Sequence, residues 1–282
     1  MIKRLILILI IGSTCILFSC KKEKAEIVEP VLPVVPPRAE KLNYGDSVFY
    51  VKESTAKYVI APGLVRSGRY AAFPDGLKIN ELTGEIDVNE SETGLKYIVS
   101  FISSQPADTL FTSMVISGIN YYDKIYNLSQ GDSIATPIYN ANNKLELPGI
   151  NDGNVFDESG GCKKAGIVVD SKNAVINLAE SVRNQGIDTG STEEVKLQYR
   201  INDKSSKALN NLSVKIYFYR DVSEIPEYLI DLIRERKGTI LSANVPEQPF
   251  VQSFAKRING FSINAAAQRA RPRPPCIIVV SR

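Results

Sequence analysis

The sequence predicts a mainly β fold, with two tandem β-sandwich domains and one α-helix on the C-terminal side. The main observation is a repeat: residues 76–91 recur without gaps ninety positions later as residues 166–181. Both copies place apolar residues two apart on either side of a polar turn, which is typical of a β-hairpin with one buried face. Segments such as 47–52 and 212–219 are short and rich in β-branched and aromatic residues, as strands are. A repeat of this length built from short strands indicates two sandwiches in series.

The turn inside the repeated hairpin differs between the two copies. Gly84 ends the first turn, and glycine takes a positive φ without steric cost. Ala174 stands at the equivalent position of the second copy. We therefore expect a different turn geometry in the second hairpin.

The first copy, with its approach, reads Phe73-Pro-Asp-Gly-Leu-Lys-Ile-Asn-Glu-Leu-Thr-Gly-Glu-Ile. It resembles the signature of the bacterial Ig-like, cadherin-like repeats, and the residues that match are Pro74, Gly76, Leu77, Thr83, Gly84 and Ile86. The second copy departs from this signature, with Asn173-Ala174 in place of Thr-Gly. The resemblance implies an Ig-like or cadherin-like sandwich, which is an architecture rather than an activity.

Residues 1–19 are typical of a secretory signal peptide, with Lys3 and Arg4 before an uncharged apolar run. That run is shorter than the roughly 20 residues of a membrane-spanning helix. The ending Leu17-Phe-Ser-Cys20 resembles a bacterial lipobox, which implies cleavage before Cys20 and acylation of Cys20. Cys15 does not fit, because Gly12 stands where a lipobox has Leu. An ordinary signal peptide and an uncleaved anchor helix are the alternatives.

The rest of the chain divides into four further segments. Residues 20–40 would be the lipidated Cys and a Pro-rich linker, which polyproline II geometry makes a semi-rigid spacer. The first sandwich is expected over 41–119 and the second over 120–240, including a helix at 224–237. The apolar stripe of that helix would pack on its own domain, with partner binding as the alternative. The tail, 241–282, gives no clear element except a candidate final strand near its end.

Two kinds of side chain are candidates for binding or cross-linking. Four tyrosines gather in the loop-rich start of the second module and would form a ligand platform for sugars if their rings were exposed: Tyr121, Tyr122, Tyr126 and Tyr139. The alternative interpretation makes them strand and core residues. Cys162 and Cys276 would form a disulfide in an exported protein, or else remain two separate buried thiols.

The sequence offers little for catalysis or for cofactors. It contains no His, which excludes Ser-His-Asp and Cys-His catalysis as well as His-ligated zinc. No phosphate-binding glycine motif is present, and no cofactor or metal is expected. Asp152, Asp157 and Glu158 lie in a Gly- and Asn-rich loop where calcium binding is an alternative to plain solvation. The formal net charge of +3 is close to balanced and gives no indication of a nucleic-acid partner.

Together these features predict a non-enzymatic, lipid-anchored cell-envelope protein of the outer membrane, on its periplasmic or surface face. Its role would be binding or structural, with an envelope glycan or another outer-membrane protein as the partner. The alternative function is that of an accessory glycan-binding lipoprotein in an outer-membrane polysaccharide-uptake system. A carboxylate-dependent hydrolase is a third interpretation, for which no motif selects a residue pair.

Overall fold

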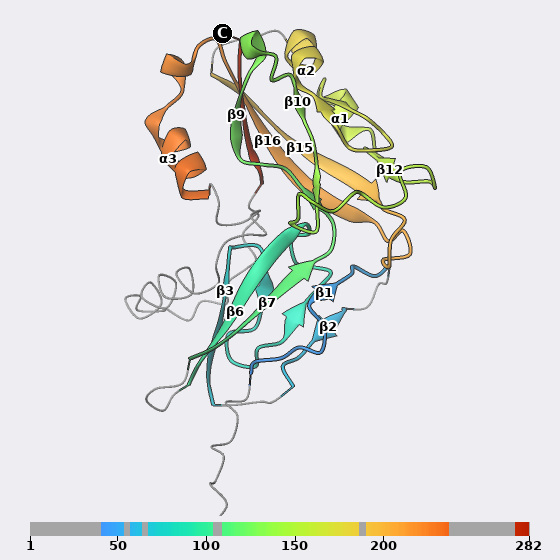
Figure 1. Cartoon of the computed structure of the whole chain (residues 1–282), viewed down its shortest axis with the longest axis vertical. Coiled ribbons are helices and arrows are strands. Elements are labelled where there is room, and N and C mark those ends of the chain that lie inside the picture. Colours follow the sequence, from blue (N-terminus) through green and yellow to red (C-terminus); the bar gives the residue numbers. More distant parts are fainter. Residues whose placement is uncertain are drawn as a thin grey trace, which may run out of the picture. The chain divides into compact units, whose positions relative to one another are not determined.

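The computed structural model describes residues 41–53, 57–63, 67–103, 109–185, 190–236 and 274–281 (Figure 1). The predicted signal peptide, Cys20, the linker and the first part of the tail lie outside these residues. The described residues belong to one compact unit that begins at Lys41. They are mainly β-strand and form a β-sandwich protein, as the sequence predicts.

The first sandwich consists of a four-stranded and a three-stranded sheet. The larger sheet has the order β1-β7-β6-β3, with β1 (Val48–Phe49), β7 (Thr109–Ile116), β6 (Leu95–Ser103) and β3 (Gly68–Phe73). In it β1 runs parallel to β7, while β6 is antiparallel to both of its neighbours. The smaller sheet has the order β2-β5-β4, with β2 (Val59–Ile60), β5 (Ile86–Asp87) and β4 (Lys78–Ile79).

The second sandwich has a five-stranded sheet and a three-stranded sheet. The larger sheet has the order β12-β15-β16-β17-β9, with β12 (Val155–Phe156), β15 (Ser191–Arg200), β16 (Asn210–Tyr219), β17 (Cys276–Val280) and β9 (Lys124–Asn127). The smaller sheet has the order β10-β14-β13, with β10 (Ile134–Ala135), β14 (Ile176–Asn177) and β13 (Val168–Val169). A two-stranded ribbon joins β8 (Ile119–Asn120) to β11 (Ile138–Tyr139).

The sequence repeat is confirmed by strand register. Lys78 pairs with Asp87 in the first hairpin, and Val168 pairs with Asn177 in the second, each residue ninety positions from its counterpart. The serine after each hairpin also has the same role. The Ser91 hydroxyl donates to the Asp87 carbonyl at 2.6 Å, as the Ser181 hydroxyl donates to the Asn177 carbonyl at 2.6 Å. Each hairpin is therefore closed by the same side chain.

The expectation of a different second turn is wrong. Gly84 has φ of 73° and Ala174 has φ of 59°, so both occupy the left-handed region. Their amides also donate to equivalent carbonyls, Gly84 to Asn80 at 2.8 Å and Ala174 to Asp170 at 3.0 Å. Ala174 is fully buried in the core of the second sandwich, so packing holds it in a conformation that alanine otherwise disfavours.

The two hairpins lead into different elements. The sequence places a strand at 174–178, but the chain turns into a helix, α2 (Leu178–Gln185), directly after β14. The Asn177 side chain caps the start of this helix: it accepts a hydrogen bond from the Glu180 amide and donates one to the Glu180 carboxylate. In the first copy no helix follows β5, and Gly94, at the position equivalent to Asn184, has φ of 75°. Another short helix, α1 (Gly161–Lys164), also lies in the second sandwich.

The predicted C-terminal helix is α3 (Glu227–Arg236), preceded by a 3-10 turn at Val222–Glu224. It packs on its own sandwich, where fully buried Leu229 joins Tyr217, Tyr219 and Ile278 in a hydrophobic cluster. Leu232 and Ile233 pack against the same cluster, so the predicted apolar stripe faces the protein. At the end of the helix Arg236 forms an ion pair of 3.0 Å with Asp123, whose side chain is 4% exposed.

The final strand, β17, lies inside the large sheet and not at its edge. It lies between β16 and β9 (Figure 1) and is parallel to both. All five of its residues are buried. In the first sandwich the corresponding first and last strands, β1 and β7, pair directly. The candidate final strand near the end of the tail is thus confirmed, as an interior strand of the second sandwich.

Candidate functional site

The two sandwiches are joined through a buried tyrosine hydroxyl. Tyr199, at the end of β15, is fully buried, and its hydroxyl accepts from the Ile119 amide at 3.1 Å. The same oxygen lies 2.7 Å from the Thr93 hydroxyl, which belongs to the first sandwich. Burial raises the pKa of Tyr199 to about 12, so its proton is retained at neutral pH. The core of the first sandwich also includes Ile138 and Ala208 from the second half of the chain.

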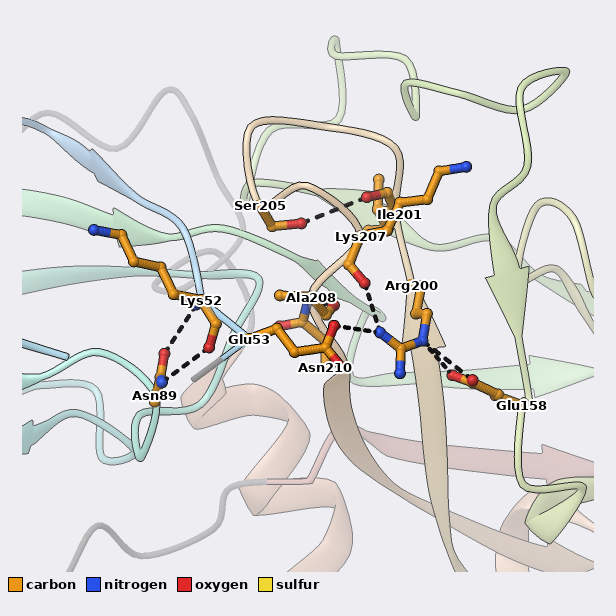
Figure 2. Close-up of polar contacts among 10 residues, drawn as sticks. All are labelled: Lys52, Glu53, Asn89, Glu158, Arg200, Ile201, Ser205, Lys207, Ala208 and Asn210. Atoms are coloured by element: carbon orange, nitrogen blue, oxygen red, sulfur yellow. Dashed lines mark hydrogen bonds and ion pairs between the residues drawn. The ribbon is translucent and has the colours of Figure 1, made fainter. Parts of the chain in front are cut away.

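A second connection is made by Arg200, the residue that follows this tyrosine in the chain. Figure 2 shows its contacts. Its guanidinium pairs with Glu158 at 2.8 Å and with Glu53 at 2.7 Å, and it donates to the Lys207 carbonyl at 2.8 Å. Glu53 comes from the first sandwich, whereas Glu158 and Lys207 belong to the second. One side chain therefore links a loop of each sandwich to the β15–β16 turn.

The Asn89 side chain holds the loop after β1, on the first-sandwich side of this junction. The Asn89 side chain accepts from the Lys52 amide at 3.0 Å and donates to the Lys52 carbonyl at 3.1 Å, as Figure 2 shows. Asn210 is 4% exposed and donates to the Ala208 carbonyl at 3.2 Å. Its amide oxygen has no hydrogen-bond partner among the described residues. A buried acceptor left without a donor costs about 1–3 kcal/mol, so Asn210 is an unusual choice for a purely structural position.

Asn89 and Asn210 line a cleft of about 370 Å³ between the sandwiches. One wall comes from the segment after β5, with Asn89, Glu90 and Glu92. The other wall comes from β15 and β16, with Lys196 and Asn210 among its residues. Most of the lining side chains are polar, and the cleft is the candidate binding site.

The charges at this cleft do not neutralise each other. Glu90 and Lys196 are both exposed and both line the cleft. No ion pair involving either residue occurs in the described part of the chain. The two walls therefore offer an anionic acceptor and a cationic donor to the same space.

The predicted tyrosine platform is wrong. Tyr121, Tyr126 and Tyr139 are buried, and only Tyr122 is exposed, at 38%. The Tyr121 hydroxyl donates to the Ala174 carbonyl of the second hairpin turn, as the Tyr44 hydroxyl donates to the Gly84 carbonyl of the first.

Burial raises the pKa of Tyr121, Tyr126 and Tyr139, because an ionised phenol is poorly solvated in the interior. The Tyr139 hydroxyl donates to an Asp203 carboxylate oxygen at 2.8 Å. The Tyr121 and Tyr139 hydroxyls thus donate to internal acceptors, and the buried rings of Tyr121, Tyr126 and Tyr139 are not available for stacking on a sugar.

The two cysteines are not joined by a disulfide. Both are buried thiols, Cys162 in the core of the second sandwich and Cys276 in the cluster beneath α3. The disulfide considered from the sequence is therefore not formed, and the structure agrees with the alternative of two separate buried thiols. Burial, and then the Asp157 carboxylate, raise the pKa of the Cys162 thiol to about 12.

Two of the three acidic residues considered as calcium ligands have side-chain partners, while Asp152 accepts hydrogen bonds through its backbone carbonyl from Asn202 and Lys207. Asp157 accepts from the amides of Cys162 and Lys163 at 2.9 Å each and caps α1, while Glu158 pairs with Arg200. No group of three or more potential metal ligands is found among the described residues.

The sequence contained one overlooked indication of the cleft. Along β16 the inward positions are Leu212, Val214, Ile216 and Phe218, and Asn210 continues the same alternation. A polar residue at an apolar position is the kind of local exception that marks functional or strained sites. Lys196 and Glu90 gave no such indication, because exposed charges are common on strands and loops.

No protein-family profile matches the chain, and no curated protein matches it. Among solved structures, the chain is similar to human protocadherin-24 EC1-2, at 9% identity over 64% of this chain and 98% of that one, with a TM-score of 0.22. It is also similar to Drosophila N-cadherin EC1-4, at 10% identity over 62% and 48% of the two chains, with a TM-score of 0.21.

A third similar structure is a SusE-like surface-located polysaccharide-binding protein from the Bacteroides thetaiotaomicron heparin utilisation locus. It shares 10% identity over 63% of this chain and 34% of that one, with a TM-score of 0.22. With TM-scores this low, none of these similarities indicates a function for the chain. Within the described residues, no helix is long and apolar enough to cross a membrane.

Proposed function

We propose that this chain is a lipid-anchored cell-envelope protein with a non-catalytic binding or structural role. The observation that carries the proposal is the fixed junction between the sandwiches, in which the buried Tyr199 hydroxyl contacts both Thr93 and Ile119. Such a junction keeps two domains in one orientation, as a spacer or a binding arm requires. It also holds the two walls of the polar cleft, one from each sandwich, in a fixed position relative to each other.

The anchor is proposed from the sequence. Cys20 follows an apolar run and a small residue, and residues 21–40 would separate the lipid from the first sandwich. Acylation at the sulfur and at the new amino terminus would provide more than the two signals that stable attachment needs. The outer membrane is the proposed location.

A non-catalytic role is supported by the chemistry of the Cys162 thiol. The Cys162 thiol is buried and its pKa is raised, whereas thiol catalysis needs an exposed thiolate. The chain also has no His to act as a general base.

The proposal is tested by fractionating a Gram-negative host that expresses the full chain, Cys20→Ala, or Cys15→Ala as a matched control. We expect the unmodified chain and Cys15→Ala in the outer-membrane fraction and Cys20→Ala released from it or retained as a precursor in the inner membrane. Equal distribution of all three chains would reject the anchor.

A further inference from the structure

The second sandwich contains one strand that has no counterpart among the described residues of the first. β15 and β16 follow the second hairpin as β6 and β7 follow the first, and both pairs are antiparallel. In the first sandwich β7 pairs directly with β1. In the second, β17 lies between β16 and β9, which occupy the equivalent places. β9 and β16 therefore border a slot, one strand wide, that β17 fills.

The slot holds β17 through its backbone and through both of its faces. Because β17 is parallel to both neighbours, main-chain hydrogen bonds hold it from two sides. Ile277 and Val279 are buried in the core of the sandwich. Ile278 and Val280 are buried in the cluster beneath α3. An empty slot would expose two unpaired strand edges and this apolar lining, so it would bind another strand of the same pattern.

The chain between α3 and β17 is longer than their connection requires. Arg236, at the end of α3, donates to the Pro274 carbonyl at 3.1 Å. The Asp123 carboxylate accepts from both Arg236, at 3.0 Å, and the Cys276 amide, at 2.8 Å. Segment 237–273 therefore begins and ends at one point. Residues 220–236 alone provide the dozen or more residues that a parallel crossover needs. A segment as long as 237–273 spans up to about 120 Å when extended, which is enough to reach a neighbouring molecule.

We propose that the slot between β9 and β16 accepts β17 from a second copy of this chain, so that two copies exchange the strand and form a dimer. The second copy has the same slot and the same strand, so each copy fills the slot of the other and the exchange closes with two-fold symmetry. The contacts of β17 within the slot are the same in the monomer and in the dimer, so concentration decides between them. Strand exchange does not require the lipid anchor, although crowding at a membrane would favour it.

A connection of this kind gives β17 an effective concentration of the order of 1 mM for its own slot. The chain is therefore a monomer in dilute solution, and the dimer becomes prominent only as the protein concentration approaches that value.

A single substitution reports which copy provides β17. Lys215 on β16 is the direct partner of Cys276 on β17, so Lys215→Cys places two thiols at positions that a disulfide can bridge. An intrachain disulfide identifies the monomer, and an interchain disulfide identifies the exchanged dimer. The purified full-length chain is reduced, held in urea just below its unfolding midpoint at low-micromolar or near-millimolar concentration, and returned to buffer. It is then oxidised and separated on non-reducing gels.

We expect the interchain share of the Lys215→Cys disulfide to rise about tenfold or more between the two concentrations. Lys215→Cys combined with Cys276→Ala should form no disulfide-linked dimer, which assigns the bond to β17. The matched control is Lys196→Cys with Ser213→Cys in a Cys276→Ala background. It joins β15 to β16 within one hairpin and should stay intrachain at both concentrations.

Strand exchange is overturned if the Lys215→Cys disulfide is intrachain at both concentrations, if no disulfide forms, or if the hairpin control forms dimers to the same extent. Fractionation of Cys20→Ala tests the lipid anchor separately. A membrane-attached chain that does not exchange β17 would therefore contradict the exchange alone, whereas a chain that exchanges β17 but carries no acyl group would contradict the anchor alone.

Discussion

The two hairpin turns allow a reciprocal substitution, Gly84→Ala in the first and Ala174→Gly in the second. Both positions have a positive φ, at which alanine is disfavoured by about 1–2 kcal/mol. At Gly84 an added Cβ would also lie 2.7–2.8 Å from three atoms of the Tyr70 ring. That ring is 2% exposed and packs on Phe101 at a centroid distance of 4.9 Å, so it has little room to move. Overpacking of this kind adds about 1–3 kcal/mol.

We therefore expect Gly84→Ala to lower the free energy of unfolding by about 2–4 kcal/mol. This range allows for the partly compensating effect of alanine, which reduces the conformational entropy of the unfolded chain. Ala174→Gly removes the backbone strain, but it loses a buried methyl group worth about 0.8 kcal/mol and increases the unfolded-state entropy. These effects nearly cancel, so its change should stay within about 1 kcal/mol.

Urea titrations of the unmodified chain and both variants, followed by circular dichroism, measure this difference directly. Thermal scans should agree, since 1 kcal/mol shifts Tm by about 2–4 °C in a chain of this size. Equal destabilisation by the two substitutions, or a stable Gly84→Ala protein, would refute the packing argument.

Three further predictions concern the junction, the helix and the buried phenols. Tyr199→Phe leaves the buried Ile119 amide without its acceptor and should lower the unfolding free energy by about 2 kcal/mol, while the exposed control Tyr228→Phe should have no effect in the same urea titration. Arg236→Leu removes the ion pair that Arg236 forms with the buried Asp123 carboxylate and should destabilise the chain by about 3 kcal/mol. A double variant that also carries Asp123→Asn should recover part of this loss, and a fully additive result would argue against the pair. The pKa of Tyr199 is raised from 10.0 to about 12 in the folded chain, so the unfolded chain loses its proton first as the pH rises. The stability that Tyr199 contributes should thus be constant up to about pH 10 and be lost between about pH 10 and 12. Cys162, whose pKa is raised from 9.0 to about 12, adds a loss that begins near pH 9, so Tyr199→Phe should reduce the fall without abolishing it, and an unchanged fall would contradict the assignment.

The sequence was most informative where the pattern was local. The hairpin alternation predicted strand pairs that occur with the expected ninety-residue offset, and the apolar stripe of α3 predicted the face that packs on the sandwich. α2 was missed because the alternation of β14 appeared to continue through Leu178. The pair Asn177 and Glu180 was the available capping signal.

The features that the sequence did not predict depend on tertiary contacts. Ala174 keeps a positive φ because the surrounding core holds it, which no local propensity describes. The tyrosines point inward because turn carbonyls and Asp203 accept their hydroxyls. β17 joins β16 and β9 from far along the chain, and the cleft brings together Glu90 and Lys196 from different sandwiches. Such long-range pairings are not visible in periodicity.

The lipid anchor is the central claim, and the intact mass of the protein extracted from host membranes tests it most directly. We predict a chain that begins at Cys20 and carries the added mass of acyl groups, and we predict that Cys20→Ala lacks that mass. A chain that retains Met1, or a processed chain with an unmodified Cys20, would contradict the proposal.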